Sequence, residues 1–176
     1  MLQIREIRLS GPNVEDASVK FGPGPNVIAG ESDTGKSYLL HCLDYIFGAE
    51  ELKKRIPQAE PYDELKVEFQ NTAGDYLTLV RSLAGGDLKA HRSQIDAIDG
   101  DGEAIAYRRH GTSKADDVTS VLFPFAGIKE AMLRKDNDGK VQRLTIRTFL
   151  PTIIVDEVSV IEEQSPVLGR GGFDET

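Results

Sequence analysis

The chain has one cysteine, few histidines and no long hydrophobic run, and each shortage excludes a class of protein. A single cysteine, Cys42, among 176 residues rules out an internal disulfide and fits a reducing cytosol. The histidines at 41, 91 and 110 are widely separated, so they form no zinc pattern. No apolar run reaches membrane-spanning length, and the first residues do not resemble a signal peptide. We therefore expect a cytoplasmic protein with no membrane contact.

Positive charge is also scarce, because 21 lysines and arginines are outnumbered by 29 aspartates and glutamates, for a net charge of −8. This balance argues against a broad nucleic-acid-binding surface. The one dense basic cluster, Arg108-Arg109-His110, has a solvated loop as its simplest interpretation. With 39% hydrophobic residues, the chain is long enough for one domain with a sizeable core.

One motif carries clear chemistry. The fixed positions of the phosphate-binding loop G-x-x-x-x-G-K-[ST] are all matched by Gly30-Glu31-Ser32-Asp33-Thr34-Gly35-Lys36-Ser37. Such a loop surrounds nucleotide phosphates with backbone N–H groups, and we include the following Tyr38 among the nucleotide-binding residues. Lys36 is expected to act as the catalytic cation at the β- and γ-phosphates, and the Ser37 hydroxyl to bind Mg²⁺. The predicted cofactors are ATP and Mg²⁺.

The residues around the motif strengthen this interpretation. Residues 26–29 form a short apolar run that predicts a buried strand before the loop. After the loop, apolar residues at helical spacing predict a helix that ends near Gly48. The loop would thus lead into a helix N-terminus, where free N–H groups and the helix dipole favour anions.

The rest of the sequence predicts further strands. Apolar patterns indicate strands over residues 2–9 and 17–21, and an antiparallel hairpin from 65–69 and 76–80. A third strand near 88–92 would extend that hairpin, and residues 115–126 favour a helix. The expected fold class is α/β: a P-loop nucleotide-hydrolase lobe with a central mixed sheet, a helix after the loop, and an antiparallel β-meander subdomain at about 65–92.

Residues 1–47 resemble the start of the ATPase heads of structural-maintenance-of-chromosomes, RecF and related repair proteins, in a bacterial branch of these coiled-coil ATPases. The closest match is Phe21-Gly22-Pro23-Gly24-Pro25-Asn26-Val27-Ile28-Ala29-Gly30, which leads into the loop. The resemblance implies that residues 1–164 form the N-terminal lobe of an ABC-type head and that 165–176 begin a linker to a coiled coil. It also implies a C-terminal head lobe, from the same or another chain, as partner, a head-to-head dimer on ATP, and DNA as a further partner.

Two carboxylates near the end of the chain could complete a metal site. Asp156 and Glu157 follow an apolar run, as in a Walker B strand, where one carboxylate orients Mg²⁺ and the next polarises the attacking water. The resemblance instead places them where such heads carry their Q-loop, whose glutamine would be replaced by Glu157 or displaced to Gln164. Both interpretations put Asp156 and Glu157 near the metal, with Glu157 as a candidate catalytic residue.

Two other segments imitate known motifs. Leu83-Ala84-Gly85-Gly86-Asp87 is similar to the ABC signature, but the alternating residues around it favour a hairpin turn. Ser113-Lys114-Ala115-Asp116 is similar to a guanine-reading motif, but no apolar strand precedes it. Without a signature, we expect residues 1–176 to bind ATP and to hydrolyse it poorly. The alternatives are a self-contained small P-loop kinase or GTPase, and a non-catalytic nucleotide-gated interaction module.

Overall fold

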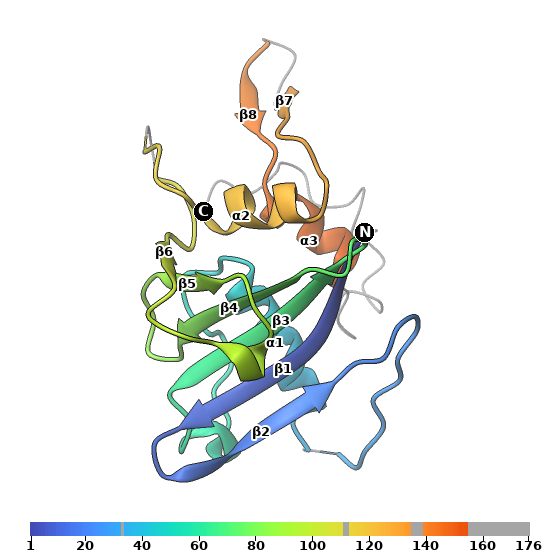
Figure 1. Cartoon of the computed structure of the whole chain (residues 1–176), viewed down its shortest axis with the longest axis vertical. Helices are drawn as coiled ribbons and strands as arrows, with labels where there is room; N and C mark the ends of the chain where they lie inside the picture. The colour runs from blue at the N-terminus through green and yellow to red at the C-terminus, as the bar shows by residue number, and fades with distance from the viewer. Residues whose placement is uncertain (33, 111–112, 135–138, 155–176) are drawn as a thin grey trace.

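The computed structural model of the chain describes residues 1–32, 34–110, 113–134 and 139–154 (Figure 1). Its strands are β1 (Leu2–Gly11), β2 (Val14–Lys20), β3 (Glu64–Asn71), β4 (Tyr76–Ser82), β5 (Leu88–His91), β6 (Glu103–Ile105), β7 (Met132–Arg134) and β8 (Val141–Arg143). Its α-helices are α1 (Lys36–Ile46), α2 (Val118–Phe125) and α3 (Ile146–Ile153). Two short 3₁₀ turns, η1 (Pro57–Ala59) and η2 (Ile95–Ala97), lie in the connections.

Strands β1 to β6 form a single antiparallel sheet in the order β2-β1-β3-β4-β5-β6. The β3–β4 hairpin turns at residues 71–75, where the Asn71 side chain accepts hydrogen bonds from the N–H groups of Ala73 and Asp75, both at 2.9 Å. β1 pairs with β2 on one side and with β3 on the other. The strand that opens the chain therefore lies inside the sheet.

A β-bulge interrupts β1 at Arg5. Ile4 pairs with Phe69 and Glu6 pairs with Glu68, so Arg5 is the extra residue on its strand. The apolar positions of β1 shift accordingly, from 2 and 4 before the bulge to 7 and 9 after it. The bulge thus keeps the apolar side chains on one face and leaves Arg5 and Glu6 together on the other.

Helix α1 covers the apolar face of the sheet, behind it in Figure 1, and packs on β3 and β4. Its residues Cys42, Tyr45 and Ile46 are fully buried. They meet a layer of sheet side chains that are also 0% exposed, namely Leu65, Val67, Phe69, Leu77 and Leu79. This apolar burial is the main stabilising contribution and fixes α1 against the sheet.

Helices α2 and α3 close one end of the same core and carry a projecting β7–β8 hairpin, at the top of Figure 1. Asp117 caps α2 by accepting a hydrogen bond from the Ser120 N–H at 2.8 Å. Arg143 on β8 donates to Asp117 at 2.8 Å and to Glu130 at 2.9 Å. These bonds tie the hairpin to the start of α2.

The expected central mixed sheet with a separate β-meander is wrong. The meander strands β3 to β5 share one sheet with β1 and β2, and its strand pairs are all antiparallel, unlike the parallel central sheet of a P-loop lobe. The cause is a long-range match between apolar residues. Ile7 and Leu9 of β1 pair with Val67 and Leu65 of β3, which places all four on the face that α1 covers.

The predicted strand over residues 26–29 is also wrong. Val27 is 93% exposed and Ile28 is 43% exposed, and neither is paired in the described part of the chain. The Asn26 amide donates to the carbonyls of Gly22 at 3.1 Å and Gly24 at 2.8 Å, which folds this stretch into a turn. A β-branched run becomes a strand only when a neighbouring strand satisfies its backbone.

Several other predictions are confirmed. The opening strands, the β3–β4 hairpin and β5 form close to their expected positions, and the predicted helix at 115–126 is α2. Residues 146–153, in the apolar run before Asp156, form helix α3 and not a strand. No helix among the described residues has the length and apolar character needed to cross a membrane.

Candidate nucleotide-binding site

The phosphate loop, residues 30–37, leads directly into helix α1. Gly35 is the residue before the helix and has a φ of 84°, a left-handed conformation that suits glycine. α1 begins at Lys36, and no side chain caps its first turn. A helix start without a side-chain cap leaves N–H groups for an anion.

Lys36 folds back over the loop. Its Nζ donates to the carbonyl oxygen of Gly30 at 2.7 Å, to that of Glu31, and to the Thr34 hydroxyl at 3.2 Å. The Thr34 hydroxyl in turn donates to the Glu31 carbonyl at 2.8 Å. The ammonium group therefore sits at the centre of the loop and holds its two ends together.

The two residues after Lys36 have different environments. Ser37 is exposed at the start of α1, so its hydroxyl is accessible to a metal ion. The Tyr38 ring is 4% exposed and lies in the core, where burial raises the pKa of its hydroxyl to about 12. The Tyr38 N–H donates to the Gly35 carbonyl at 3.0 Å. The backbone of Tyr38 therefore lies beside the loop, while its side chain lies in the core.

The remaining predicted site residues fall outside the described part of the chain. They are Asp33 of the loop, the carboxylates Asp156 and Glu157, and Gln164. Helix α3, which precedes the carboxylates in sequence, is tied to α1 by an ion pair between Arg147 and Asp44 at 2.5 Å. This pair joins α3 to the helix that carries the phosphate loop.

The two segments that are similar to known motifs, residues 83–87 and 113–116, have structural roles. Gly85 and Gly86 adopt positive φ in the β4–β5 turn, so the segment similar to the ABC signature is a hairpin turn, as predicted. Asp116 accepts a hydrogen bond from the Ser120 hydroxyl at 3.1 Å and lies 3.8 Å from Arg109. Its carboxylate is therefore engaged at the start of α2.

Sequence reasoning missed Arg81, a buried arginine at the other end of α1. Its Nη1 donates to the carbonyls of Tyr45 at 2.7 Å and Ala49 at 2.6 Å, and its Nε donates to Gly86 at 2.9 Å. Burial lowers the pKa of Arg81, and the guanidinium stacks 3.8 Å from the centre of the Tyr45 ring. The available signal was its position on β4, two residues after Leu79 and in phase with the apolar face.

The loop fits a nucleotide phosphate, and its fit to Mg²⁺ rests on Ser37. The left-handed Gly35, the uncapped helix start and the ammonium group of Lys36 all favour an anion at this position. Within the described residues, no cluster of three or more His, Cys, Asp or Glu side chains could hold a metal. Mg²⁺ at nucleotide sites is usually bound by one or two carboxylates together with the phosphates, so the Ser37 hydroxyl is the one expected ligand that the described residues supply.

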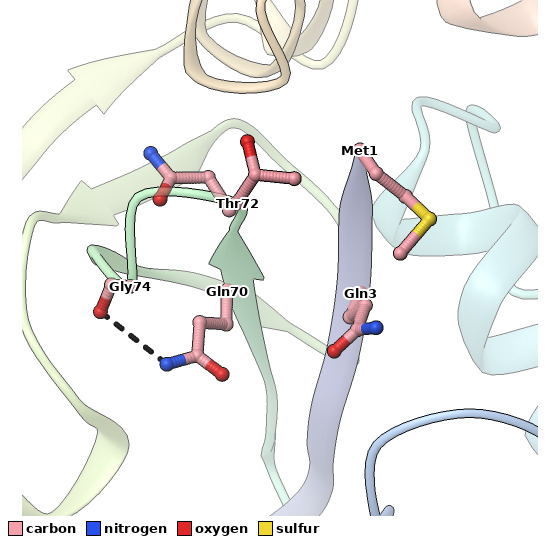
Figure 2. A pocket seen from close by; sticks show the side chains of 6 residues that line it. Met1, Gln3, Gln70, Thr72 and Gly74 are labelled. Atoms are coloured by element: carbon pink, nitrogen blue, oxygen red, sulfur yellow. Dashed lines mark hydrogen bonds between the residues drawn. The ribbon is translucent and has the colours of Figure 1, made fainter.

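Two surface hollows lie away from the phosphate loop. Figure 2 shows the larger, of about 300 Å³, between the start of β1 and the β3–β4 turn, with the Gln70 amide donating to the Gly74 carbonyl at 3.3 Å. The second, of about 230 Å³, is lined by charged residues of β1, β2 and β3. Neither includes a residue of the loop.

Comparison of the chain with protein-family models finds no match, and comparison with curated proteins finds none either. Function must therefore be inferred from the residues of the loop and their surroundings.

Proposed function

We propose that the chain binds ATP and Mg²⁺ through the phosphate loop. We further propose that it serves as the N-terminal lobe of an ABC-type ATPase of the structural-maintenance-of-chromosomes kind, which couples ATP binding and hydrolysis to conformational change in DNA maintenance or defence. The phosphate loop, which leads directly into α1, supports this role. The antiparallel sheet is not that of a P-loop lobe and gives no support.

The contact of Lys36 with its own loop carries the proposal. An ammonium group bound to the carbonyls of Gly30 and Glu31 stands where the phosphates of a bound nucleotide can reach it. A phosphate oxygen could replace the Thr34 hydroxyl as its third acceptor. Charge-assisted bonds of this kind are worth about 1.5–3 kcal/mol each.

The residues of the loop would have different functions at the nucleotide. Lys36 and the first N–H groups of α1 would neutralise negative charge on the β- and γ-phosphates, and Ser37 would ligate the metal. Mg²⁺, when bound, supplies further neutralisation of the phosphate oxygens. Glu157 would act on the attacking water.

A second lobe would complete the site. Val27 and Ile28 form an exposed apolar stretch immediately before the loop, where a partner could cover them. We infer that this partner is a C-terminal head lobe, from the same or another chain, and that two heads close on ATP. DNA is proposed as a partner from the sequence resemblance alone.

Binding of Mg²⁺–ATP, measured by titration calorimetry, tests the loop. Lys36→Ala should weaken binding at least tenfold, which corresponds to about 1.4 kcal/mol. Lys54→Ala is the matched control, because Lys54 is an exposed lysine outside the loop and should leave the affinity unchanged. Equal affinity of Lys36→Ala and the unaltered chain would overturn the proposal.

Turnover separates the alternatives. Residues 1–176 alone should hydrolyse ATP well below ~1 s⁻¹, the lower end of ordinary enzyme rates. Faster turnover, or a preference for GTP, would indicate a self-contained P-loop kinase or GTPase. Binding that is never followed by hydrolysis, even with a second head lobe present, would indicate a nucleotide-gated interaction module.

A further inference from the structure

The charged hollow of about 230 Å³ lies on the sheet face opposite α1, and its lining includes Asp96 of η2. Because of the β1 bulge, two consecutive residues, Arg5 and Glu6, line it together. Glu68, directly across the ladder from Glu6, forms part of its wall. The bulge thus brings a cation and two carboxylates to one small concave surface.

Most of the charges around this hollow are neutralised by neighbours. Glu6 accepts from Arg8 at 2.7 and 2.8 Å and lies 3.7 Å from Lys20. Asp96 pairs with Arg8 at 2.7 Å, and this hydrogen bond lowers the pKa of the Asp96 carboxyl. These groups have little residual charge to offer a ligand.

Arg5 and Glu68 are different. Glu68 is 7% exposed, and its Oε2 accepts the Ile95 N–H at 2.7 Å, but no cation of the described chain pairs with it. The Arg5 guanidinium has no ion-pair or hydrogen-bond partner among the described residues. Both side chains line one hollow, yet they do not reach each other. A buried carboxylate without a cation is costly, so a ligand that supplies the missing charge gains affinity.

We propose that this hollow binds a small amino acid, with the ligand's carboxylate on Arg5 and its ammonium on Glu68. The guanidinium fork suits bidentate contact with a carboxylate. Tyr76, which also lines the hollow, would contact the carbon chain between the two charges. A volume of about 230 Å³ holds a molecule of several heavy atoms. No residue of the phosphate loop lines the hollow, so this site is separate from the proposed nucleotide site.

A series of linear amino acids tests the proposal: glycine, β-alanine, 4-aminobutyrate and 5-aminopentanoate. In ¹H–¹⁵N NMR titrations, two backbone amides report on the two walls, since the Ile95 N–H donates to Glu68 and the Phe21 N–H donates to the Arg5 carbonyl at 2.8 Å. Both should shift, with an affinity that peaks at one chain length. Butyrate and butylamine, which carry one charge each, should bind roughly tenfold more weakly or worse.

Two variants locate the binding. Glu68→Gln keeps an oxygen acceptor for the Ile95 N–H, so it removes the charge without removing the bond. It and Arg5→Gln should each weaken binding about tenfold or more. Lys89→Gln is the control, because Lys89 lies on β5, two strands from β3, and outside the hollow; this variant should bind as the unaltered chain does. Absence of shifts across the whole series, or equal binding of the singly charged compounds, would overturn the proposal.

Discussion

Replacing Arg81 should destabilise the chain strongly, because its guanidinium binds carbonyl oxygens at the C-terminal end of α1 and so joins the helix to the sheet. Arg81 is 1% exposed, and three of its N–H groups donate to carbonyl oxygens within 3 Å: those of Tyr45, Ala49 and Gly86. The first two oxygens lie at or just beyond the C-terminal end of α1, where a cation also interacts favourably with the helix dipole. No carboxylate pairs with Arg81 among the described residues, so its positive charge is stabilised by hydrogen bonds to backbone carbonyl oxygens.

The size of the effect follows from these contacts. In Arg81→Met, the carbonyls of Tyr45 and Ala49 lose charge-assisted bonds worth about 1.5–3 kcal/mol each. Loss of stacking on Tyr45 adds about 1–2 kcal/mol. Against this, methionine no longer buries a charge, which returns part of a desolvation cost of several kcal/mol. We expect a net loss of about 3 kcal/mol in the free energy of unfolding. Arg81→Lys, which keeps the charge without the planar fork, should also be destabilised.

Urea unfolding followed by circular dichroism measures the loss. With a slope of about 1–3 kcal/mol per molar urea, 3 kcal/mol moves the midpoint down by about 1–3 M. Arg92→Met is the control, because Arg92 is exposed at the end of the same hairpin. A loss below about 1 kcal/mol for Arg81→Met would refute the reasoning, since it would mean that burying the charge costs as much as its bonds return.

Three further predictions concern the surroundings of α1. Gly48→Ala should lower the free energy of unfolding by at least about 1 kcal/mol more than Gly74→Ala. Both glycines have positive φ, but only a Cβ at Gly48 would meet a backbone oxygen, at 2.4 Å. Thermal unfolding of the two variants measures the difference, and equal losses would contradict this reason. Burial raises the pKa of the Cys42 thiol from 9.0 to about 12. The free energy of unfolding should therefore fall by up to about 1.4 kcal/mol per pH unit as the pH rises through that interval, because only the unfolded chain ionises its thiol there. Cys42→Ala should show a shallower fall, and an unchanged slope would contradict the raised pKa of Cys42. The half-exposed pair of Asp44 and Arg147 should show a coupling of about 0.5–1 kcal/mol in a double-mutant cycle, and zero coupling would mean that α3 docks without it.

The parts of the fold that the sequence predicted are those set by neighbouring residues. The β3–β4 hairpin follows from two alternating runs and the turn at 71–75, and the position of α1 next to the loop follows from apolar residues at helical spacing. The bulge at Arg5 could also have been predicted, because the apolar residues of β1 change phase between Ile4 and Ile7.

What could not be predicted depends on distant partners. The pairing of β1 with β3 joins segments about sixty residues apart, and no local pattern distinguishes it from a separate subdomain. The strand expected at 26–29 does not form for the same reason, because residues with a high β propensity still need a neighbouring strand to pair with. Helix α3 had no decisive local signal, because Thr145 and Thr148 lack the Glu or Gln of a capping box and the apolar run that follows could be strand or helix.

The two ends of the phosphate loop have unequal support, and this bears on how a nucleotide could act. Downstream, the loop continues into α1, which is held by the core, by Arg81 at its far end and by Arg147 at its side. Upstream, the chain leaves the sheet at Phe21, and residues 22–30 are exposed and without regular structure. The upstream half is joined to the helix through the Lys36 bonds to Gly30 and Glu31, so a phosphate that competed for Lys36 would shift the upstream half and not the helix. Under the proposed function, the segment between β2 and the loop, which carries the exposed Val27 and Ile28, would be the part that transmits nucleotide binding to a second lobe.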